Sequence, residues 1–148
     1  MKILEVGVDK LELVLPLFEA YRAFYRQPAN EAGARDFLRE RIEKGESIIY
    51  LLVDENGNAL GFTQLYPLFS STRIGRVWLL NDLFVDPDFR GNKVGEVLFD
   101  ALRQLAVKRG WSKIRWITAD DNYRARGLYD KLSKKTMWNT YEMEIESG

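Results

Sequence analysis

Apolar side chains recur along the chain with two different periods, and these periods predict its helices and strands. A stripe at i, i+3, i+4 and i+7 spacing predicts an amphipathic helix over residues 94–109, which Gly110 ends. The same spacing predicts further helices over residues 10–26, 30–44 and 123–132. Pro16 lies inside the first of these, so we expect a kink or a break near Leu15.

Runs rich in β-branched and aromatic residues predict the strands between these helices. They cover residues 3–6, 47–54, 59–71, 76–85, 113–119 and 137–145. An Asn-Gly pair within residues 55–58 predicts a tight hairpin, so the second and third strands should pair antiparallel. Pro87 ends the fourth strand, because proline has no N–H to donate to a ladder.

The predicted order of elements is β-α-α-β-β-β-α-β-α-β. Its middle is an antiparallel meander, and the last strand of that meander leads into a β-α-β crossover. This order predicts an α/β fold in which a mixed, mostly antiparallel sheet has helices on both faces. The length of 148 residues is typical of one domain, so we expect a single domain over residues 1–148. Clefts at strand ends bind ligands in such folds.

The composition excludes several kinds of chemistry. The chain has neither cysteine nor histidine, which rules out disulfides, thiolate nucleophiles, histidine triads and tight metal sites built on these ligands. Lysine plus arginine and aspartate plus glutamate number 22 each, and this zero net charge argues against a nucleic-acid partner. No apolar run approaches the ~18 residues of a membrane span. We therefore expect no metal, no membrane association and a cytoplasmic location.

A turn with two glycines and two cations, RGNKVG, precedes the helix predicted from residue 94. Helix N-termini present unpaired N–H groups and the positive end of the dipole. Gly91 and Gly95 allow close approach of a ligand, while Arg90 and Lys93 add positive charge. The Walker A and dinucleotide patterns are both absent from this turn. The residues alone leave two interpretations open, a diphosphate-binding loop and a solvated turn that starts a helix.

Two segments resemble a known family. Residues 80–106, LNDLFVDPDFRGNKVGEVLFDALRQLA, resemble the acyl-CoA-binding core of the GNAT N-acetyltransferase superfamily, in which Arg/Gln-x-x-Gly-x-Gly/Ala follows a strand. Residues 121–132, DNYRARGLYDKL, are similar to that family's Asn-x-x-Ala-x-x-x-Tyr helix. The likeness extends to the order of elements over most of the chain. Within the superfamily it is closest to the branch of polyamine, histone and small-amine acetyltransferases.

The resemblance implies an enzyme, a single N-acetyltransferase domain with a GNAT-like fold. Its reaction would move an acetyl group from acetyl-CoA to a primary amine by direct attack. The implied acceptor is a small amine, a polyamine or an amino acid, and a protein amine is also allowed. A homodimer is compatible with the family. A different class stays open, namely a non-catalytic acyl-CoA-binding or regulatory module on the same fold.

The resemblance also assigns roles to numbered residues. The positions implied for acetyl-CoA binding are Leu83, Phe84 and Val85 along the pantetheine arm, Arg90, Gly91, Lys93, Val94 and Gly95 around the pyrophosphate, and Asn122. Tyr129 would lie near the thioester sulfur as general acid, and Asp82 is the first candidate for the base. Alternative roles are a helix cap for Asn122, core packing for Tyr129 and a structural carboxylate for Asp82.

Two positions depart from the family pattern. Lys93 stands where the loop usually has glycine, so a backbone that needs positive φ would be strained there. Asn81 occupies the strand position that often carries the acidic base, and Asp82 follows it. Strand alternation puts consecutive side chains on opposite faces unless a bulge intervenes, so only one of the two should face the cleft.

Aromatic residues offer further candidates for contact with the acceptor. Phe18, Tyr21, Phe24 and Tyr25 are interpreted as core packing, and one or two of them near the helix end could also line an acceptor pocket. Tyr66 and Trp78, on adjacent predicted strands, are candidates for direct contact with the substrate.

Overall fold

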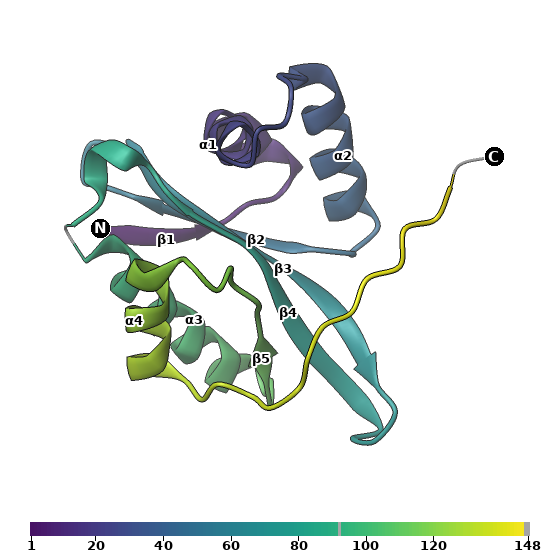
Figure 1. The fold of residues 1–148 in the computed structure, drawn as a ribbon. Coiled ribbons are helices and arrows are strands. Elements are labelled where there is room, and N and C mark those ends of the chain that lie inside the picture. The colour runs from purple at the N-terminus through teal and green to yellow at the C-terminus, as the bar shows by residue number, and fades with distance from the viewer. Residues whose placement is uncertain (92, 147–148) are drawn as a thin grey trace. The chain divides into compact units, whose positions relative to one another are not determined.

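The computed structural model describes residues 1–91 and 93–146, and the chain divides into two compact units (Figure 1). The first unit is Met1–Ile117 and carries every assigned strand together with helices α1, α2 and α3. The second unit is Thr118–Gly148 and carries helix α4 and the C-terminal segment.

The first unit is built on a five-stranded mixed sheet with the order β1-β2-β3-β4-β5. Its strands are β1 (Lys2–Glu5), β2 (Ile48–Val53), β3 (Ala59–Ser70), β4 (Gly75–Val85) and β5 (Ile114–Arg115). Neighbours pair antiparallel from β1 to β4, whereas β5 runs parallel to β4. The sheet is therefore mixed and mostly antiparallel, as the pattern predicted.

The helices are α1 (Leu11–Phe24), α2 (Glu31–Glu43), α3 (Val94–Arg109) and α4 (Tyr123–Leu132). Figure 1 shows α1 and α2 on one face of the sheet and α3 on the other. Each face has its own apolar core. Leu15, Leu38 and Phe62 belong to the core under α1 and α2. Val94, Leu98 and Leu60 belong to the core under α3, and each such burial contributes about 1.5–3 kcal/mol.

Strand β2 explains why its sequence, IIYLLV, is apolar throughout. Alternate residues of a strand face opposite sides of the sheet. Leu51 packs in the α1–α2 core and Leu52 in the α3 core, and both are completely buried. A strand covered on both faces needs apolar residues at every position, which is what this sequence supplies.

Helix α1 runs without interruption through Pro16. The proline removes one backbone hydrogen bond, but Leu11–Phe24 is a single helix, so the expected break does not occur. Leu11, Leu15 and Phe18 are buried in the core on either side of it. Packing of this apolar face outweighs the local cost of the proline.

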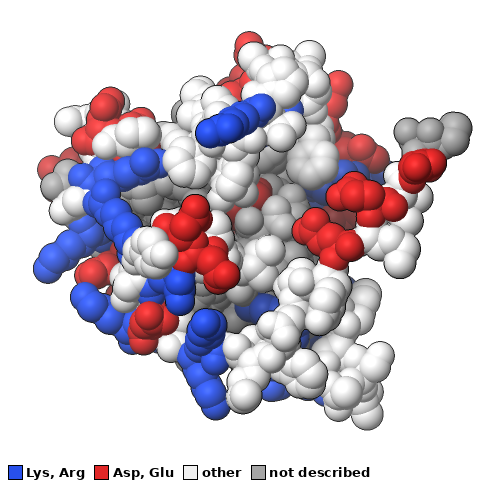
Figure 2. Space-filling view, in the orientation of Figure 1, with Lys and Arg blue, Asp and Glu red and all other residues white. Residues whose placement is uncertain are grey.

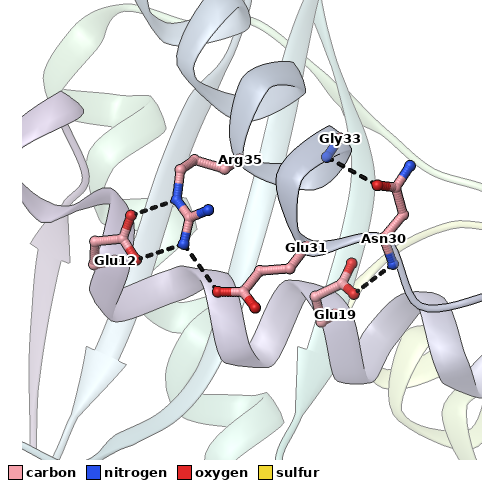
Figure 3. A network of polar contacts seen from close by, with 6 residues as sticks. All are labelled: Glu12, Glu19, Asn30, Glu31, Gly33 and Arg35. Carbon is pink, nitrogen blue, oxygen red and sulfur yellow. Dashed lines mark hydrogen bonds and ion pairs between the residues drawn. The ribbon is translucent and has the colours of Figure 1, made fainter.

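Polar contacts fasten α2 to α1 (Figure 3). Arg35 of α2 donates from Nε to Glu12 Oε1 of α1 at 2.7 Å, and its second nitrogen contacts Glu31 Oε1 at 2.9 Å. Asn30 caps α2, because its Oδ1 accepts from the Gly33 N–H at 3.0 Å. The two helices thereby hold the segment that connects them, which matters for the pocket described below.

The prediction for the C-terminal segment was wrong. Residues 137–145 form no strand, and their large apolar side chains are 80–97% exposed. Alternation of apolar and polar residues favours a strand only where a neighbouring strand supplies ladder hydrogen bonds. The strand predicted over residues 113–119 is likewise shortened to Ile114–Arg115, because its register with β4 covers only Trp78 and Leu79. The described element order therefore ends with α4.

Both signs of charge are found on the face of the molecule seen in Figure 2. Figure 2 shows Lys and Arg side chains together with Asp and Glu side chains on the visible face. This agrees with the formal net charge of zero over the whole sequence.

Candidate active site

Strand β4 contains a bulge that brings two consecutive polar residues to one pocket. Asp82 pairs with Gln64 and Leu80 pairs with Leu65, so Asn81 is an extra residue without a partner of its own on β3. Asn81 donates from Nδ2 to Asp82 Oδ1 at 2.8 Å, and both residues line the same pocket. A β-bulge was named as the exception to strand alternation, and the structure contains such a bulge at Asn81.

The pocket lies entirely within the first unit and has a volume of about 500 Å³. Residues from α1, the α1–α2 connection, α2, β3 and β4 form it. They are Phe18, Tyr21, Arg22, Tyr25, Gln27, Asn30, Gly33, Ala34, Phe37, Tyr66, Asn81 and Asp82. Five aromatic rings therefore surround one carboxyl group. Ligand pockets commonly combine apolar walls with a few polar groups in this way.

Asp82 is the buried acid of this pocket, with 3% of its surface exposed. Its Oδ2 accepts from Gln64 Nε2 and its Oδ1 accepts from Asn81. Burial raises the pKa of Asp82, and the hydrogen bonds from Gln64 and Asn81 offset part of that rise. A carboxylate with a raised pKa is a stronger base than one on the surface.

Two tyrosines stay protonated beside this carboxyl group. The Tyr21 hydroxyl donates to the backbone oxygen of Asn81 at 3.4 Å. Burial, followed by the negative charge of Asp82, raises the pKa of Tyr21 and of Tyr66 well above the ordinary range. Both phenols therefore remain neutral at physiological pH. They offer O–H groups and ring faces, and ring faces attract cations.

The connection between α1 and α2 forms one side of the pocket and is held by an ion pair. Arg22 contacts Glu19 Oε1 at 3.0 Å and donates to the Pro28 carbonyl oxygen at 3.0 Å. Glu19 Oε2 also accepts from the Asn30 N–H at 3.1 Å (Figure 3). These contacts hold residues 25–30 in place, and Tyr25 of this segment lines the same pocket as Asp82.

The positions expected to bind pantetheine lie beyond the end of β5. Strand β5 pairs with β4 only at Trp78 and Leu79. Leu83, Phe84 and Val85 pair with β3 on their other side. Among the described residues this stretch of β4 thus has one edge without a ladder partner, apart from the Val85 carbonyl, which accepts from Arg90 Nε at 3.1 Å. An extended amide-containing arm fits such an edge.

The loop before α3 has the backbone expected of an anion site. Gly91 has φ +89° and Lys93 has φ +60°, both in the left-handed region. The Val97 N–H donates to the Lys93 carbonyl, and the N–H groups of Val94 and Gly95 belong to the first turn of α3, where helices present donors. Val94 itself is buried in the α3 core. Asn92 lies outside the described residues.

The Arg90 side chain contacts aromatic rings of β4 and of the end of α1. Its guanidinium carbon lies 5.4 Å from the centre of the Phe84 ring and 5.7 Å from the centre of the Phe24 ring. Together with its bond to Val85, these contacts fold the side chain back against β4. Arg90 therefore anchors the start of the loop. Lys93, with its positive φ, occupies a backbone conformation that glycine favours.

Asn122 and Tyr129 belong to helix α4 of the second unit. Asn122 Oδ1 accepts from the Ala125 N–H at 3.4 Å, so its role as a helix cap is confirmed. The backbone oxygen of Tyr129, in the last turn, accepts from the Ser133 N–H at 2.9 Å. The roles of Asn122 and Tyr129 at the cofactor stay predictions.

The aromatic candidates divide between the pocket and the rest of the molecule. Tyr66, Tyr21 and Tyr25 line the pocket with Phe18, whereas Trp78 stacks on Trp111 with ring centres 4.4 Å apart. The sequence analysis missed Gln64, the partner of Asp82. A signal was present, because a Thr-Gln pair interrupts the otherwise apolar run of β3.

The family follows from a direct comparison. The model of the Acetyltransferase (GNAT) family matches residues 14–133, which is most of the chain. The chain belongs to the GNAT family of acetyltransferases. It is accordingly an acyl-CoA-dependent acetyltransferase with the α/β fold of that family, a family that uses acetyl-CoA as co-substrate.

Individual relatives agree with this assignment. The chain is 41% identical over 131 residues to "Uncharacterized N-acetyltransferase YhfO" of Bacillus subtilis (strain 168), covering 88% of this chain and 87% of the relative. It is 24% identical over 148 residues to "Thialysine N-epsilon-acetyltransferase" of Caenorhabditis elegans, covering 97% and 91%. A solved structure, "Crystal structure of a probable acetyltransferase", superposes with a TM-score of 0.90 at 34% identity over 100% of both chains.

Two features are absent from the described residues. None of their helices combines the length and apolar character that crossing a bilayer requires. No group of three or more His, Cys, Asp or Glu side chains among them is arranged to hold a metal ion.

Proposed function

We propose that this GNAT enzyme transfers an acetyl group from acetyl-CoA to a primary amine that binds in the pocket beside Asp82. The observation that carries the proposal is a buried carboxyl group enclosed by aromatic rings. An ammonium group is attracted both by the carboxylate and by the ring faces. A chain without cysteine or histidine lacks the usual residues for a covalent acyl-enzyme, which favours direct attack by the amine.

The acceptor is proposed to be a small amine, a polyamine or an amino acid. A volume of about 500 Å³ accommodates a molecule of this size, and the side chain of a protein lysine is also small enough to enter. The relative named for thialysine supports an acceptor with an amino group on a flexible chain, and it supports the branch of polyamine and small-amine enzymes.

Each step of the proposed reaction has a residue of this chain. Asp82 takes a proton from the acceptor ammonium, which frees the nitrogen lone pair for attack. Acetyl-CoA supplies the activated acetyl group as a thioester. A backbone N–H near Phe84 stabilises the developing oxyanion, and Tyr129 returns a proton to the departing sulfur. Burial raises the pKa of Asp82, which suits its role as acceptor of that proton.

The cofactor is proposed to bind along β4 and over the start of α3. Leu83, Phe84 and Val85 would bond the pantetheine arm, and the open edge of β4 supports this. The pyrophosphate is proposed to lie against the loop, where the N–H groups of the first helical turn and the left-handed backbone support an anion site. The loop residues are Arg90, Gly91, Lys93, Val94 and Gly95, and Asn122 is proposed to join the pantetheine contacts.

The organisation of the protein is proposed to be one N-acetyltransferase domain over residues 1–148, assembled as a homodimer. The family model spans parts of both compact units, which supports a single domain. The exposed apolar side chains of residues 137–145 support a second copy of the chain as their cover, because surfaces of this kind mark interaction sites. The cytoplasmic location stays a prediction.

A second candidate is a non-catalytic acyl-CoA-binding module. Lys93 favours it, since a lysine in the left-handed region beside a diphosphate departs from the family loop. Binding alone requires neither a buried carboxyl group nor an aromatic pocket beside it, and both of these features are found in the first unit. The enzyme is therefore the better supported of the two.

The test begins with calorimetric titration of acetyl-CoA into the purified protein. A panel of diamines, polyamines, basic amino acids and lysine peptides is then added while free thiol is measured. The proposal predicts binding followed by thiol release for one class of amine. Binding without release for any amine would favour the non-catalytic module, and absence of binding would remove the proposed cofactor site.

A further inference from the structure

Gln64 is a buried amide that meets Asp82 from the neighbouring strand. It lies opposite Asp82 in the β3–β4 register and none of its surface is exposed. Its Nε2 donates to Asp82 Oδ2, whereas its Oε1 is a buried oxygen without a hydrogen-bond partner among the described residues. A buried carbonyl oxygen without a partner destabilises a fold. The neighbours Phe62 and Leu65 show that apolar residues fit this part of β3.

We infer that Gln64 is a positioning residue that holds Asp82 through both of its protonation states during acetyl transfer. The inference rests on the proposed role of Asp82 as the base. Packing at this position does not require the unpartnered Oε1 atom, and an ionised carboxylate has no hydrogen to donate to it. A protonated Asp82 would give this oxygen a hydrogen-bond partner.

The two ends of the amide suit the two forms of the carboxyl group. An ionised carboxylate only accepts hydrogen bonds, and Nε2 is a donor. A protonated carboxyl group has an O–H to donate, and Oε1 is an acceptor. Rotation of the terminal amide by about 180° exchanges the two ends without moving the rest of the side chain. Gln64 can therefore keep Asp82 Oδ2 bonded both before and after it takes the proton.

The proton transfer is balanced without a further reactant. An N–H bond of the acceptor ammonium breaks, its electron pair stays on nitrogen, and an O–H bond forms at Asp82. Loss of that proton to water in the pocket restores the carboxylate. Asn81 donates from Nδ2 to Asp82 Oδ1. Gln64 donates to Oδ2, and the Tyr21 hydroxyl also interacts with the Asp82 carboxyl group.

The two tyrosines beside Asp82 do not change charge in the relevant pH range. Tyr21 from α1 and Tyr66 from β3 remain neutral, because burial and the charge of Asp82 raise the pKa of each. Arg22 on α1 is paired with Glu19. The charge of Arg41 on α2 acts on Tyr66. An acid limb in the activity of this pocket therefore reports Asp82.

The experiment compares two neighbouring substitutions on β3. Gln64→Met keeps the shape of the side chain but removes both the donor and the acceptor at Oδ2. Thr63→Val is the matched control, because Thr63 is equally buried and donates from Oγ1 to the backbone oxygen of Asp82 at 3.0 Å, away from the carboxyl group. The rate kcat/KM for the amine is measured against pH at saturating acetyl-CoA, with thermal unfolding of each variant.

Gln64→Met should move the acid midpoint of kcat/KM upward by about one to two pH units, because the ionised form loses a charge-assisted hydrogen bond. Thr63→Val should leave the midpoint in place even where it lowers the unfolding temperature. Gln64→Glu is a second variant of nearly the same size, in case Gln64→Met fails to fold. It should also raise the midpoint, because two carboxyl groups in contact share one proton.

The outcomes separate this inference from the proposed function. A midpoint that moves no further in the Gln64 variants than in Thr63→Val would overturn the inference, while the base would stand if Asp82→Asn abolished activity. Full activity of Asp82→Asn would overturn both. An upward shift confined to the Gln64 variants would support a positioning role at the carboxyl group.

Discussion

Asn81 and Asp82 are consecutive residues of β4, and the Asn81 side chain donates to the Asp82 carboxylate at 2.8 Å within one pocket. This relationship exists because the bulge at Asn81 interrupts the alternation of the strand. A regular strand would have turned one of the two side chains toward α3. The bulge thus places an acid and an amide together in a pocket that aromatic side chains of α1 and α2 also line.

Replacement of the proposed base should separate chemistry from folding. Asp82→Asn should lower kcat for acetyl transfer by about 10²–10⁴, because the side chain no longer accepts a proton. Initial rates of thiol release at saturating acetyl-CoA give the measurement. Asp100→Asn, which changes an exposed acid on α3, is the control and should have the wild-type rate. Wild-type turnover by Asp82→Asn would assign the base elsewhere.

The same carboxyl group should leave a signature in the pH dependence of stability. Burial raises the folded-state pKa of Asp82 above the value of about 3.9 found in unfolded chains. Between the two pKa values the folded protein binds more protons than the unfolded chain, so this residue lowers the free energy of unfolding as pH rises. Denaturant titrations of wild type and Asp82→Asn from about pH 4 to 8 should show that the wild type loses stability relative to the variant. A constant difference would contradict a raised pKa.

The proposed general acid lies in the second unit and needs its own test. Tyr129→Phe should lower turnover by about 10²–10⁴ and leave acetyl-CoA affinity nearly unchanged, because only the proton donor is removed. Calorimetry and thiol release give the two quantities. Tyr123→Phe, which changes an exposed tyrosine on the same helix, serves as the control. An unchanged rate in Tyr129→Phe would remove this residue from the mechanism.

Lys93 allows backbone strain and charge to be measured separately. Its φ of +60° costs an L-residue about 1 kcal/mol, and glycine avoids most of that cost. Lys93→Gly should therefore unfold at higher denaturant concentration than Lys93→Ala, which keeps the strain. Both variants lose the charge, so both should bind acetyl-CoA more weakly than wild type. Equal stability of the two variants would argue against strain at this position.

Sequence patterns predicted the sheet and the helices because each periodic run also had a partner to pack against. The stripe of α3 and the apolar run of β2 both lie against buried cores. The strand predicted over residues 137–145 had the same kind of pattern, but pairing depends on a neighbour that local sequence does not specify. The continuity of α1 through Pro16 was not predictable from local sequence either, because the packing that maintains the helix is a tertiary effect.

The candidate site was predicted only in part. Asp82 was identified, and a bulge was named as the condition for it to share a face with Asn81. The residues of β4 do not by themselves predict the bulge, because the bulge arises from the register of β4 with β3. Gln64 interrupts the apolar run of β3, but the register with β4 decides which residue lies opposite it, and that residue gives Gln64 its importance. Motif spacing indicated the loop before α3, but not the position of the Arg90 side chain against Phe84.

The central claim, that the amine binds in the aromatic pocket beside Asp82, is tested most directly by the amine KM of Tyr25→Ala. Tyr25 lines the pocket, whereas Phe69 is an exposed aromatic residue of β3 outside it. Loss of one ring face from a bound ammonium costs about 1 kcal/mol, so Tyr25→Ala should raise the amine KM about fivefold and leave the KM for acetyl-CoA unchanged. Phe69→Ala should match wild type. An amine KM equal in both variants, or a rise in the acetyl-CoA KM of Tyr25→Ala instead, would contradict the claim.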